Sequence, residues 1–569
     1  MRTKLAILLL FIVPVMSMRA QDVGNLKGQK PVVFHGSLGA GADFYNSNEA
    51  YPTRPPFAWS VYGSFTPSVY GVSLPFSFVV TQYGKSYASP FAQLGISPSY
   101  KWVKLHLGYR AMVFSPLVFA GQSFLGGGIE LSPRGLYFGA FYGLLNKAVQ
   151  EDTSFAHPIE PQYQRIGYGF KIGVGSVKNN FSFSFFHAKD DSGSIKRLQD
   201  TLTTVLPQEN SVVGASWHFT FFHHWVWTGD LAAGLLNRDQ SYQEIDSIGY
   251  YKIPTLMRKI MPINWSSVFS YAGQSQLSFT WKTINASAGY RRIAPDFVSL
   301  GVPYMLNDLE MVNGAFGGNL DKGRLSTNLA FTTQHDNLSH QLASTLVTRT
   351  ANLGMNAFVS QHFDLNGTVT AVQVYQQNGV QQLSDSVRMN QLMIAVTIAP
   401  TLNFSDNNYQ HTITASVSYT DLNDRNPVTA EVAGGNNVST SLNYALYFTH
   451  AFWGLNTSLL YSQYGQGANR YQSTGLNAGV NTQLLSAHQL SLQGSVGYFL
   501  NHYTSSPTGN NTTFSFNGNY TLQHHSLGVY LNYVLTPPIN LNPLTTIYHI
   551  PIAVNSRNLA GGIQYGFHF

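Results

Sequence analysis

The chain has 569 residues, of which only 10% are charged and 14% are aromatic. Soluble proteins carry about 25% charged residues, so this is not the composition of an ordinary cytosolic enzyme. Cysteine is absent, which excludes disulfides and cysteine metal sites, and the modest net charge of +6 lacks the concentrated basic patch of a nucleic-acid-binding protein.

The first segment in chain order is typical of a secretory signal peptide. Two cations precede an apolar stretch over residues 5–16, and the small residue Ala20 follows it. We expect a signal peptide over residues 1–20, cleaved near Ala20, and then a short periplasmic segment over residues 21–31. No later run of about 18 apolar residues predicts a membrane-spanning helix.

From residue 32 to the end, apolar and polar residues alternate. Residues 412–419 and 490–498 show the pattern clearly, with aliphatic and aromatic residues at one parity and Ser, Thr, Gln or Gly at the other. Successive side chains of a strand point to opposite faces, so each segment has one apolar and one polar face. The polar face carries few charges and the strands span about 10 to 15 residues, which is typical of a membrane barrel with a wet lumen.

Residues 165–175 contain four glycines and superficially resemble a nucleotide-binding loop. The G-x-G-x-x-G spacing is not met, and no helical pattern follows. The glycines share their parity with Arg165 and Lys171, whereas the apolar residues have the other parity. We therefore predict a strand whose inner face is small and carries two lumenal cations.

The same assignment of faces predicts the effect of added charge. Arginine should impair folding at Tyr168 or Val417, on the predicted lipid face, by about 2 to 4 kcal/mol near the middle of the membrane. It should be milder at Gly169 or Ser416, on the predicted lumenal face.

The connections between the expected strands alternate between short and long. Short turns such as 178–180 and 361–363 alternate with long connections such as 190–209 and 237–267. Outer-membrane barrels have short periplasmic turns and longer extracellular loops. We predict one all-β domain over residues 32–569, a transmembrane antiparallel β-barrel of about 26 strands, with 24 as the alternative. The barrel must close, because an open sheet in lipid leaves unpaired backbone groups at its edges.

Four further charged residues are candidates for a lumenal charge network. Arg291, Asp308, Glu310 and Asp336 fall near the extracellular ends of adjacent expected hairpins. Lumenal charges of both signs either anchor inward loops or form a selectivity constriction. Both roles stay open for these four residues and for the two cations of residues 165–175.

The sequence offers no convincing catalytic or metal-binding motif. His223-His224 and His524-His525 fall in expected turns without the H-E-x-x-H spacing, and no acidic pair has the frame of a calcium loop. A G-x-S-x-G nucleophile motif is not evident. We therefore expect no enzyme activity, no cofactor and no metal site.

The last expected strand carries a resemblance to a known class. Ile563, Tyr565, Phe567 and Phe569 share one face. Together with the signal peptide and the alternating strands, this pattern resembles bacterial outer-membrane β-barrel proteins. The resemblance implies that these four residues form an assembly signal for the barrel-assembly machinery, and that the protein lies among outer-membrane lipid of a Gram-negative bacterium.

Three shorter stretches, residues 290–292, 307–310 and 335–338, are similar to segments of large Bacteroidetes outer-membrane barrels. Because only a short segment precedes Val32, we expect no plug of the kind that TonB-dependent transporters carry, and we expect none of the further periplasmic domains of an usher. Two functions remain. The first is a passive or gated channel for polar solutes, and the alternative is a non-conducting surface scaffold or secretion-associated barrel that binds a partner protein.

Overall fold

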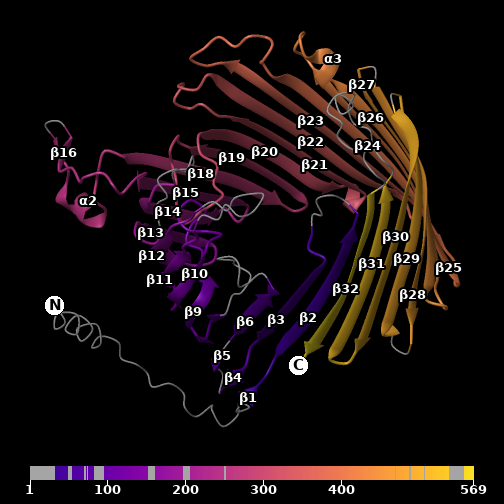
Figure 1. Ribbon diagram of the computed structural model, residues 1–569, viewed down its shortest axis with the longest axis horizontal. Helices are drawn as coiled ribbons and strands as arrows, with labels where there is room; N and C mark the ends of the chain where they lie inside the picture. The colour runs from indigo at the N-terminus through magenta and orange to yellow at the C-terminus, as the bar shows by residue number, and fades with distance from the viewer. Residues whose placement is uncertain are drawn as a thin grey trace.

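In the computed structural model, the chain forms one large antiparallel sheet (Figure 1). Among the described residues, no helix is long and apolar enough to cross a membrane. The expected signal peptide with its cleavage site near Ala20, and the segment 21–31, lie outside the described residues. The structure describes residues 32–48, 54–69, 72–73, 75–82, 95–150, 161–195, 205–248, 251–467, 469–485, 488–504, 506–536 and 556–569.

The sheet closes on itself because its first and last long strands pair. β2 (Gly36–Ser47) runs antiparallel to β32 (Ser556–His568), and Gly36 and Phe569 exchange two backbone hydrogen bonds of 3.0 Å. On its other side β2 pairs with β3 (Phe57–Phe65). The result is a closed antiparallel β-barrel of 26 strands, which confirms the predicted fold and strand number.

The other strands of the wall follow in chain order, each paired with the next. Residues 76–320 contribute β6 (Phe76–Thr81), β7 (Gly95–Ile96), β9 (Val103–Ala111), β10 (Ser123–Leu131), β11 (Leu136–Asn146), β12 (Gln164–Gly175), β13 (Asn179–Asp191), β14 (Glu209–Phe221), β15 (Trp225–Asn237), β18 (Ser267–Trp281), β19 (Ile284–Ile293) and β20 (Leu309–Leu320). Residues 325–536 contribute β21 (Leu325–His335), β22 (Ser344–Ser360), β23 (Phe363–Asn378), β24 (Asn390–Ser405), β25 (Tyr409–Asp424), β26 (Gly435–Phe448), β27 (Trp453–Gln466), β28 (Asn469–Leu484), β29 (Leu490–Tyr503), β30 (Ser506–Leu522) and β31 (His525–Thr536).

Several short strands and helical turns adjoin this wall. A ladder of two-residue strands ends on β9, and it consists of β1 (Val32–Val33), β4 (Ser68–Val69), β5 (Val72–Ser73) and β8 (Ser99–Tyr100). The 3-10 turn η3 (Asp321–Gly323) joins β20 to β21, and the short helix α3 (Ala430–Ala433) precedes β26. The wall is uneven in height, because β22 contains 17 residues whereas β9 and β10 contain 9 each.

The outer face of the barrel is apolar, as the alternation predicts. Tyr168, Val417 and Val496 are 41%, 53% and 51% exposed, in strands whose residues of the other parity face the lumen. An aromatic cluster surrounds the turn between β14 and β15, where Trp225 lies 4.8 Å from Phe279 between ring centroids. Large apolar side chains are thus exposed around the outside of a closed sheet, which is a surface suited to lipid.

Within the described wall, the backbone ladder is shortest between β6 and β9. β7 pairs with β6 at two positions and with β9 at two positions. Arg110 of β9 reaches across this seam, where its Nη1 donates a 2.8 Å hydrogen bond to Ser77 Oγ and its Nη2 donates to the carbonyl oxygens of Pro75 and Gly95. Side-chain hydrogen bonds therefore supplement the backbone ladder at the seam.

The connection between β15 and β18 extends away from the barrel (Figure 1). It contains β16 (Ser247–Ile248), β17 (Tyr251–Lys252) and α2 (Thr255–Ile260), and an isolated bridge between Glu244 and Asn264 closes its base. We call residues 238–266 the projecting arm. The longest predicted connection therefore does not fill the lumen.

Candidate functional site

Two connections fold into the lumen and pack against the inner face of the wall. Residues 112–122 join β9 to β10, and residues 294–308 join β19 to β20, and we call them the inner loops. They form one hydrophobic core with the inward side chains of β10 to β19. The core contains Met112, Phe114, Leu117, Val118, Phe119, Phe124, Phe141, Leu145, Phe186, Ala188, Val212, Ala232, Ala272, Ile293, Phe297 and Leu300.

Aromatic rings make up the centre of this core. Phe119 of the first inner loop lies 4.3 Å from Phe141 and 5.3 Å from Phe186 between ring centroids, both in stacked geometry. Phe119 and Phe186 are fully buried. Burying a phenylalanine side chain stabilises a fold by about 1.5 to 3 kcal/mol, so the first loop is held firmly against the wall.

Glycines in the wall make room for the inner loops. A Cβ atom on Gly169 would lie 3.0 Å from Cε2 of Phe114 and 2.6 Å from the backbone oxygen of Phe185. A Cβ atom on Gly214 would lie 2.4 Å from Cγ2 of Val118. The small inner face that the glycine pattern of residues 165–175 predicts therefore has a specific use, which is to admit the first inner loop.

Polar contacts fix the first inner loop at two adjacent residues, Phe114 and Ser115. Lys171 Nζ donates a 2.6 Å hydrogen bond to the carbonyl oxygen of Phe114. Asp230 accepts hydrogen bonds from Ser115 Oγ at 3.0 Å and, within the wall, from Ser216 Oγ at 2.6 Å. Inside a barrel these bonds to ionised groups are stronger than neutral ones, so they hold the loop backbone at a fixed height.

The second inner loop is tied both to the wall and to the first loop. The side chain of Asn210 donates to the carbonyl oxygen of Val298 at 3.1 Å and accepts from the backbone N–H of Leu300 at 3.0 Å. Ser299 Oγ donates to the carbonyl oxygen of Val118 at 2.6 Å. A buried asparagine thus satisfies the backbone of an irregular segment inside the barrel.

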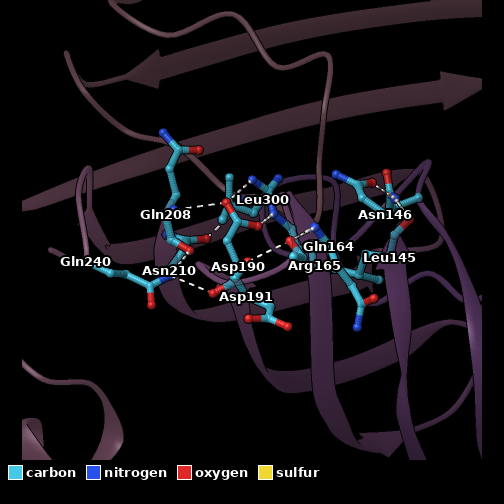
Figure 2. Close-up of polar contacts among 12 residues, drawn as sticks. Leu145, Asn146, Gln164, Arg165, Asp190, Asp191, Gln208, Asn210, Gln240 and Leu300 are labelled. Atoms are coloured by element: carbon cyan, nitrogen blue, oxygen red, sulfur yellow. Dashed lines mark hydrogen bonds and ion pairs between the residues drawn. The ribbon is translucent and has the colours of Figure 1, made fainter. Parts of the chain in front are cut away.

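An ion pair lies at the end of the barrel where the long loops emerge. Arg165 of β12 donates from Nε and Nη2 to the two carboxylate oxygens of Asp190 of β13, at 2.7 and 2.9 Å (Figure 2). The same carboxylate accepts the backbone N–H of Gln208 at 2.9 Å, and Gln240 of the projecting arm donates to the carbonyl oxygens of Asp190 and Gln208. This two-pronged pairing fixes the plane of the guanidinium.

Two neighbouring cavities flank this ion pair. One has a volume of about 590 Å³ and the other of about 610 Å³, and both are lined by Asn146, Gln162, Arg165 and Val298. The second inner loop forms one side of each, and the loop ends of β11 and β12 contribute to the other side. Volumes of this size accommodate small-molecule ligands. We call them the mouth cavities.

The sequence-predicted charge network is placed in separate parts of the molecule. Arg165 and Lys171 both face the lumen. Arg165 forms an ion pair with Asp190, and Lys171 donates a hydrogen bond to the first inner loop. Arg291 also faces inward, into a cavity of about 180 Å³ that Asp230 lines. Among the described residues, no ion pair joins Arg291 to Asp308, Glu310 or Asp336.

The three acidic members have other contacts. Asp308 accepts the backbone N–H groups of Asn337 and Leu338 at 3.0 and 2.8 Å, and Asp336 accepts that of Leu346 at 2.7 Å. Both carboxylates therefore order the connection after β21. Glu310 instead pairs with Arg292, at strand positions that share a face with the exposed Tyr290 and Val312. This pair faces the outside of the barrel.

The C-terminal residues lie in the closing strand. Ile563 and Tyr565 are exposed on the outer face, and Phe567 stacks on Phe569 with 5.8 Å between ring centroids. β32 pairs with β31 on one side and with β2 on the other. Three of the four residues of the predicted assembly signal are therefore part of the strand that completes the barrel, and Phe569 directly follows it.

Sequence reasoning missed the first inner loop. Residues 112–119 contain the apolar run Met-Val-Phe and then Pro-Leu-Val-Phe, which does not alternate. A break in period between two alternating strands was the available signal. The core that it forms with Phe186 and Phe297 depends on contacts across many strands.

One buried group has the residue types of a catalytic triad. Ser97 Oγ lies 3.1 Å from His106 Nδ1, and His106 Nε2 lies 2.6 Å from Glu130 Oε1. Ser97 is only 7% exposed, and its backbone N–H is bonded to the carbonyl oxygen of Pro75. The arrangement therefore holds the turn between β7 and β8 against β9 and β10. No cluster among the described residues gathers three or more His, Cys, Asp or Glu side chains in metal-binding positions.

Comparisons with known proteins give fold-level similarity alone. No protein-family model matches the chain, and no curated protein matches it. Among solved structures, OccAB2 of Acinetobacter baumannii is 9% identical with a TM-score of 0.32, covering 68% of this chain and 96% of its own. The translocation pore of the P pilus usher PapC is 9% identical with a TM-score of 0.33, and the match covers 94% of this chain and 99% of that one. The copper transporter OprC is 9% identical with a TM-score of 0.37, and the match covers 95% of this chain and 81% of that one. At these TM-scores the similarities carry no information on function.

Proposed function

We propose that this chain is an integral outer-membrane β-barrel of a Gram-negative bacterium and that it conducts polar solutes through a lumen narrowed by the two inner loops. The apolar outer face supports a lipid environment, with the long loops at the cell surface. The terminal residues Ile563, Tyr565, Phe567 and Phe569 would serve the barrel-assembly machinery. Transport, rather than catalysis, is the proposed role.

The observation that carries the proposal is the one-sided attachment of the inner loops. Their core contacts run to β10 through β19 and to each other. Across the lumen, the inner parity of strands such as β25 consists of Thr412, Thr414, Ser416 and Ser418. A polar wall facing an anchored apolar obstruction leaves a wet path for solutes along one side.

The anchoring also favours a passive channel over a gated one. The first inner loop is held by buried rings, by Lys171 and by Asp230, and it is bonded to the second loop at Ser299. Opening would break all of these contacts together. We therefore propose a fixed constriction.

Planar-bilayer recordings in KCl test the proposal. The protein should give stable current steps, and a variant in which residues 113–119 are replaced by a Gly-Ser linker should give larger ones, because the constriction is removed. Shortening the projecting arm by residues 245–263 is the matched control and should leave the step size unchanged. Absence of current from both the protein and the linker variant would exclude a channel.

One feature favours the second function, a surface scaffold. The projecting arm exposes Trp265 at 76% and Tyr242 at 55%, which are side chains common in protein interfaces. A barrel that stays closed in bilayers and co-purifies with one partner protein, only while the arm is intact, would support the scaffold.

A further inference from the structure

The mouth cavities differ from the rest of the lumen in the groups that they offer to a ligand. They lie side by side, and together they form a recess larger than a single sugar ring or amino acid requires. Their shared residues, Asn146, Gln162 and Arg165, place two amides and a guanidinium between the two halves. A solute that enters from the loop end would meet these groups first.

Among the described residues that line the mouth cavities, one cation has no acidic partner. Arg165 is paired with Asp190, and Arg238 is paired with Asp296. Lys147, which also lines the first cavity, is exposed, and its Nζ lies 5.6 Å from the ring centroid of Tyr109. No acidic side chain of the described residues pairs with Lys147. The recess therefore favours a ligand with one negative charge.

Arg165 can contribute to binding that charge. Its side chain is 17% exposed and that of Asp190 is 2% exposed, so the carboxylate is buried behind the guanidinium. Nε and Nη2 are used by Asp190, whereas Nη1 has no acceptor among the described residues. A fixed guanidinium with one free nitrogen is a ready donor to a carboxylate oxygen.

The remaining lining suits hydroxyl groups and a sugar ring. The Gln122 amide nitrogen donates to the carbonyl oxygen of Leu145 and to Asn146 Oδ1, which leaves the Gln122 carbonyl oxygen and the Asn146 amide nitrogen for a ligand. Such amides both donate to and accept from hydroxyls. Tyr304, at the tip of the second inner loop, is 94% exposed and lines the same cavity. Its ring offers an apolar plane for the C–H face of a sugar.

We propose that the mouth cavities bind an acidic saccharide, with its carboxylate at Lys147 and Arg165, its hydroxyls on the amides of Gln122 and Asn146, and one ring against Tyr304. The proposal rests on the proposed channel function, since it names the class of solute that the channel admits. A hydroxylated ring with a single carboxylate uses each group that the recess leaves unpaired.

Calorimetry on the detergent-solubilised barrel tests the proposal with galacturonosyl-galactose, a disaccharide with a single carboxylate, and with the neutral disaccharide digalactose. Galacturonosyl-galactose should bind about tenfold more tightly, as expected for one charge-assisted contact. Lys147→Gln should remove most of that preference, and Tyr304→Ala should weaken both sugars. Both side chains are exposed, so these variants should fold as the parent does. Tyr242→Ala, an exposed tyrosine of the projecting arm, is the matched control and should bind normally.

The outcomes separate this inference from the channel itself. Equal binding of the two disaccharides, or unchanged binding by Lys147→Gln, would overturn the acidic specificity. Binding of neither sugar by a protein that conducts KCl would overturn the saccharide site and leave the channel standing. Preferential binding of galacturonosyl-galactose by a protein without KCl current would overturn the channel and leave the site standing.

Discussion

The ammonium group of Lys171 donates a 2.6 Å hydrogen bond to the carbonyl oxygen of Phe114, which joins the wall of the barrel to the loop inside it. Both partners are anchored elsewhere, because Lys171 belongs to β12 and the Phe114 ring is buried among Phe119 and Phe141. Lys171 is thus one of the wall residues that hold the first inner loop in position.

Replacing this ammonium should loosen the loop without unfolding the barrel. Lys171→Met removes a charged hydrogen bond of about 1.5 to 3 kcal/mol while keeping much of the apolar stem. We expect noisier single-channel current with nearly the same mean step, measured in KCl. Lys282→Met, on a turn where the ammonium lies 4.9 Å from the Trp281 ring centroid, is the control. Equal noise in both variants would argue against the tether.

Enlarging Gly169 should displace the first inner loop. In Gly169→Val the new Cβ would meet the backbone oxygen of Phe185 and the ring of Phe114, so the free energy of unfolding should fall by about 1 to 3 kcal/mol. Gly494→Ala, where no atom lies within 4 Å of the added Cβ, is a permissive control. Urea unfolding in lipid vesicles measures both, and a tolerated valine would mean that the loop does not pack there.

Arginine scanning across one strand tests the faces. Val417→Arg should cost about 2 to 4 kcal/mol if the site is near mid-membrane, whereas Ser416→Arg should be milder because Ser416 faces the lumen. Loss of the heat-modifiable gel shift reports the misfolded fraction. The sequence-based expectation that arginine is also mild at Gly169 needs revision, because the inner loop occupies that part of the lumen. Equal damage at Val417 and Ser416 would contradict the assigned faces.

The seam between β6 and β9 should depend on Arg110. Arg110→Ala removes hydrogen bonds to Ser77 Oγ and to the carbonyl oxygens of Pro75 and Gly95, so the barrel should lose its heat-resistant gel mobility at a lower temperature. The expected cost is about 1 to 3 kcal/mol. Arg388→Ala, in a loop between β23 and β24, provides the comparison. If both variants lost this mobility at the same temperature, the backbone hydrogen bonds alone would be sufficient to hold the seam between β6 and β9.

The architecture was accessible from the sequence because it depends on local periodicity. Alternation at residues such as Val417 and Ile563 assigns faces strand by strand, and closure follows from the chemistry of lipid. Arg165 and Lys171 have their lumenal parity for the same reason.

Pairings between strands were not accessible in this way. Glu310 pairs with Arg292 rather than with its neighbour Arg291, and a shift of one residue changes the face of a side chain. The first inner loop was missed because its contacts with Phe186 and Phe297 bring together residues that are far apart in the chain. No local pattern encodes such contacts.

The common core of the inner loops makes the two flanks of the cylinder mechanically unequal. Strands β10 to β19 share a three-dimensional packing arrangement like that of a small water-soluble domain, whereas β22 to β31 are joined chiefly hairpin by hairpin. Amide hydrogens of the first flank should therefore exchange with solvent more slowly than those of the second. A change in the cross-section of the barrel would then deform strands β22 to β31, which face the solute path. Strands β10 to β19, which carry the constriction, would keep their shape.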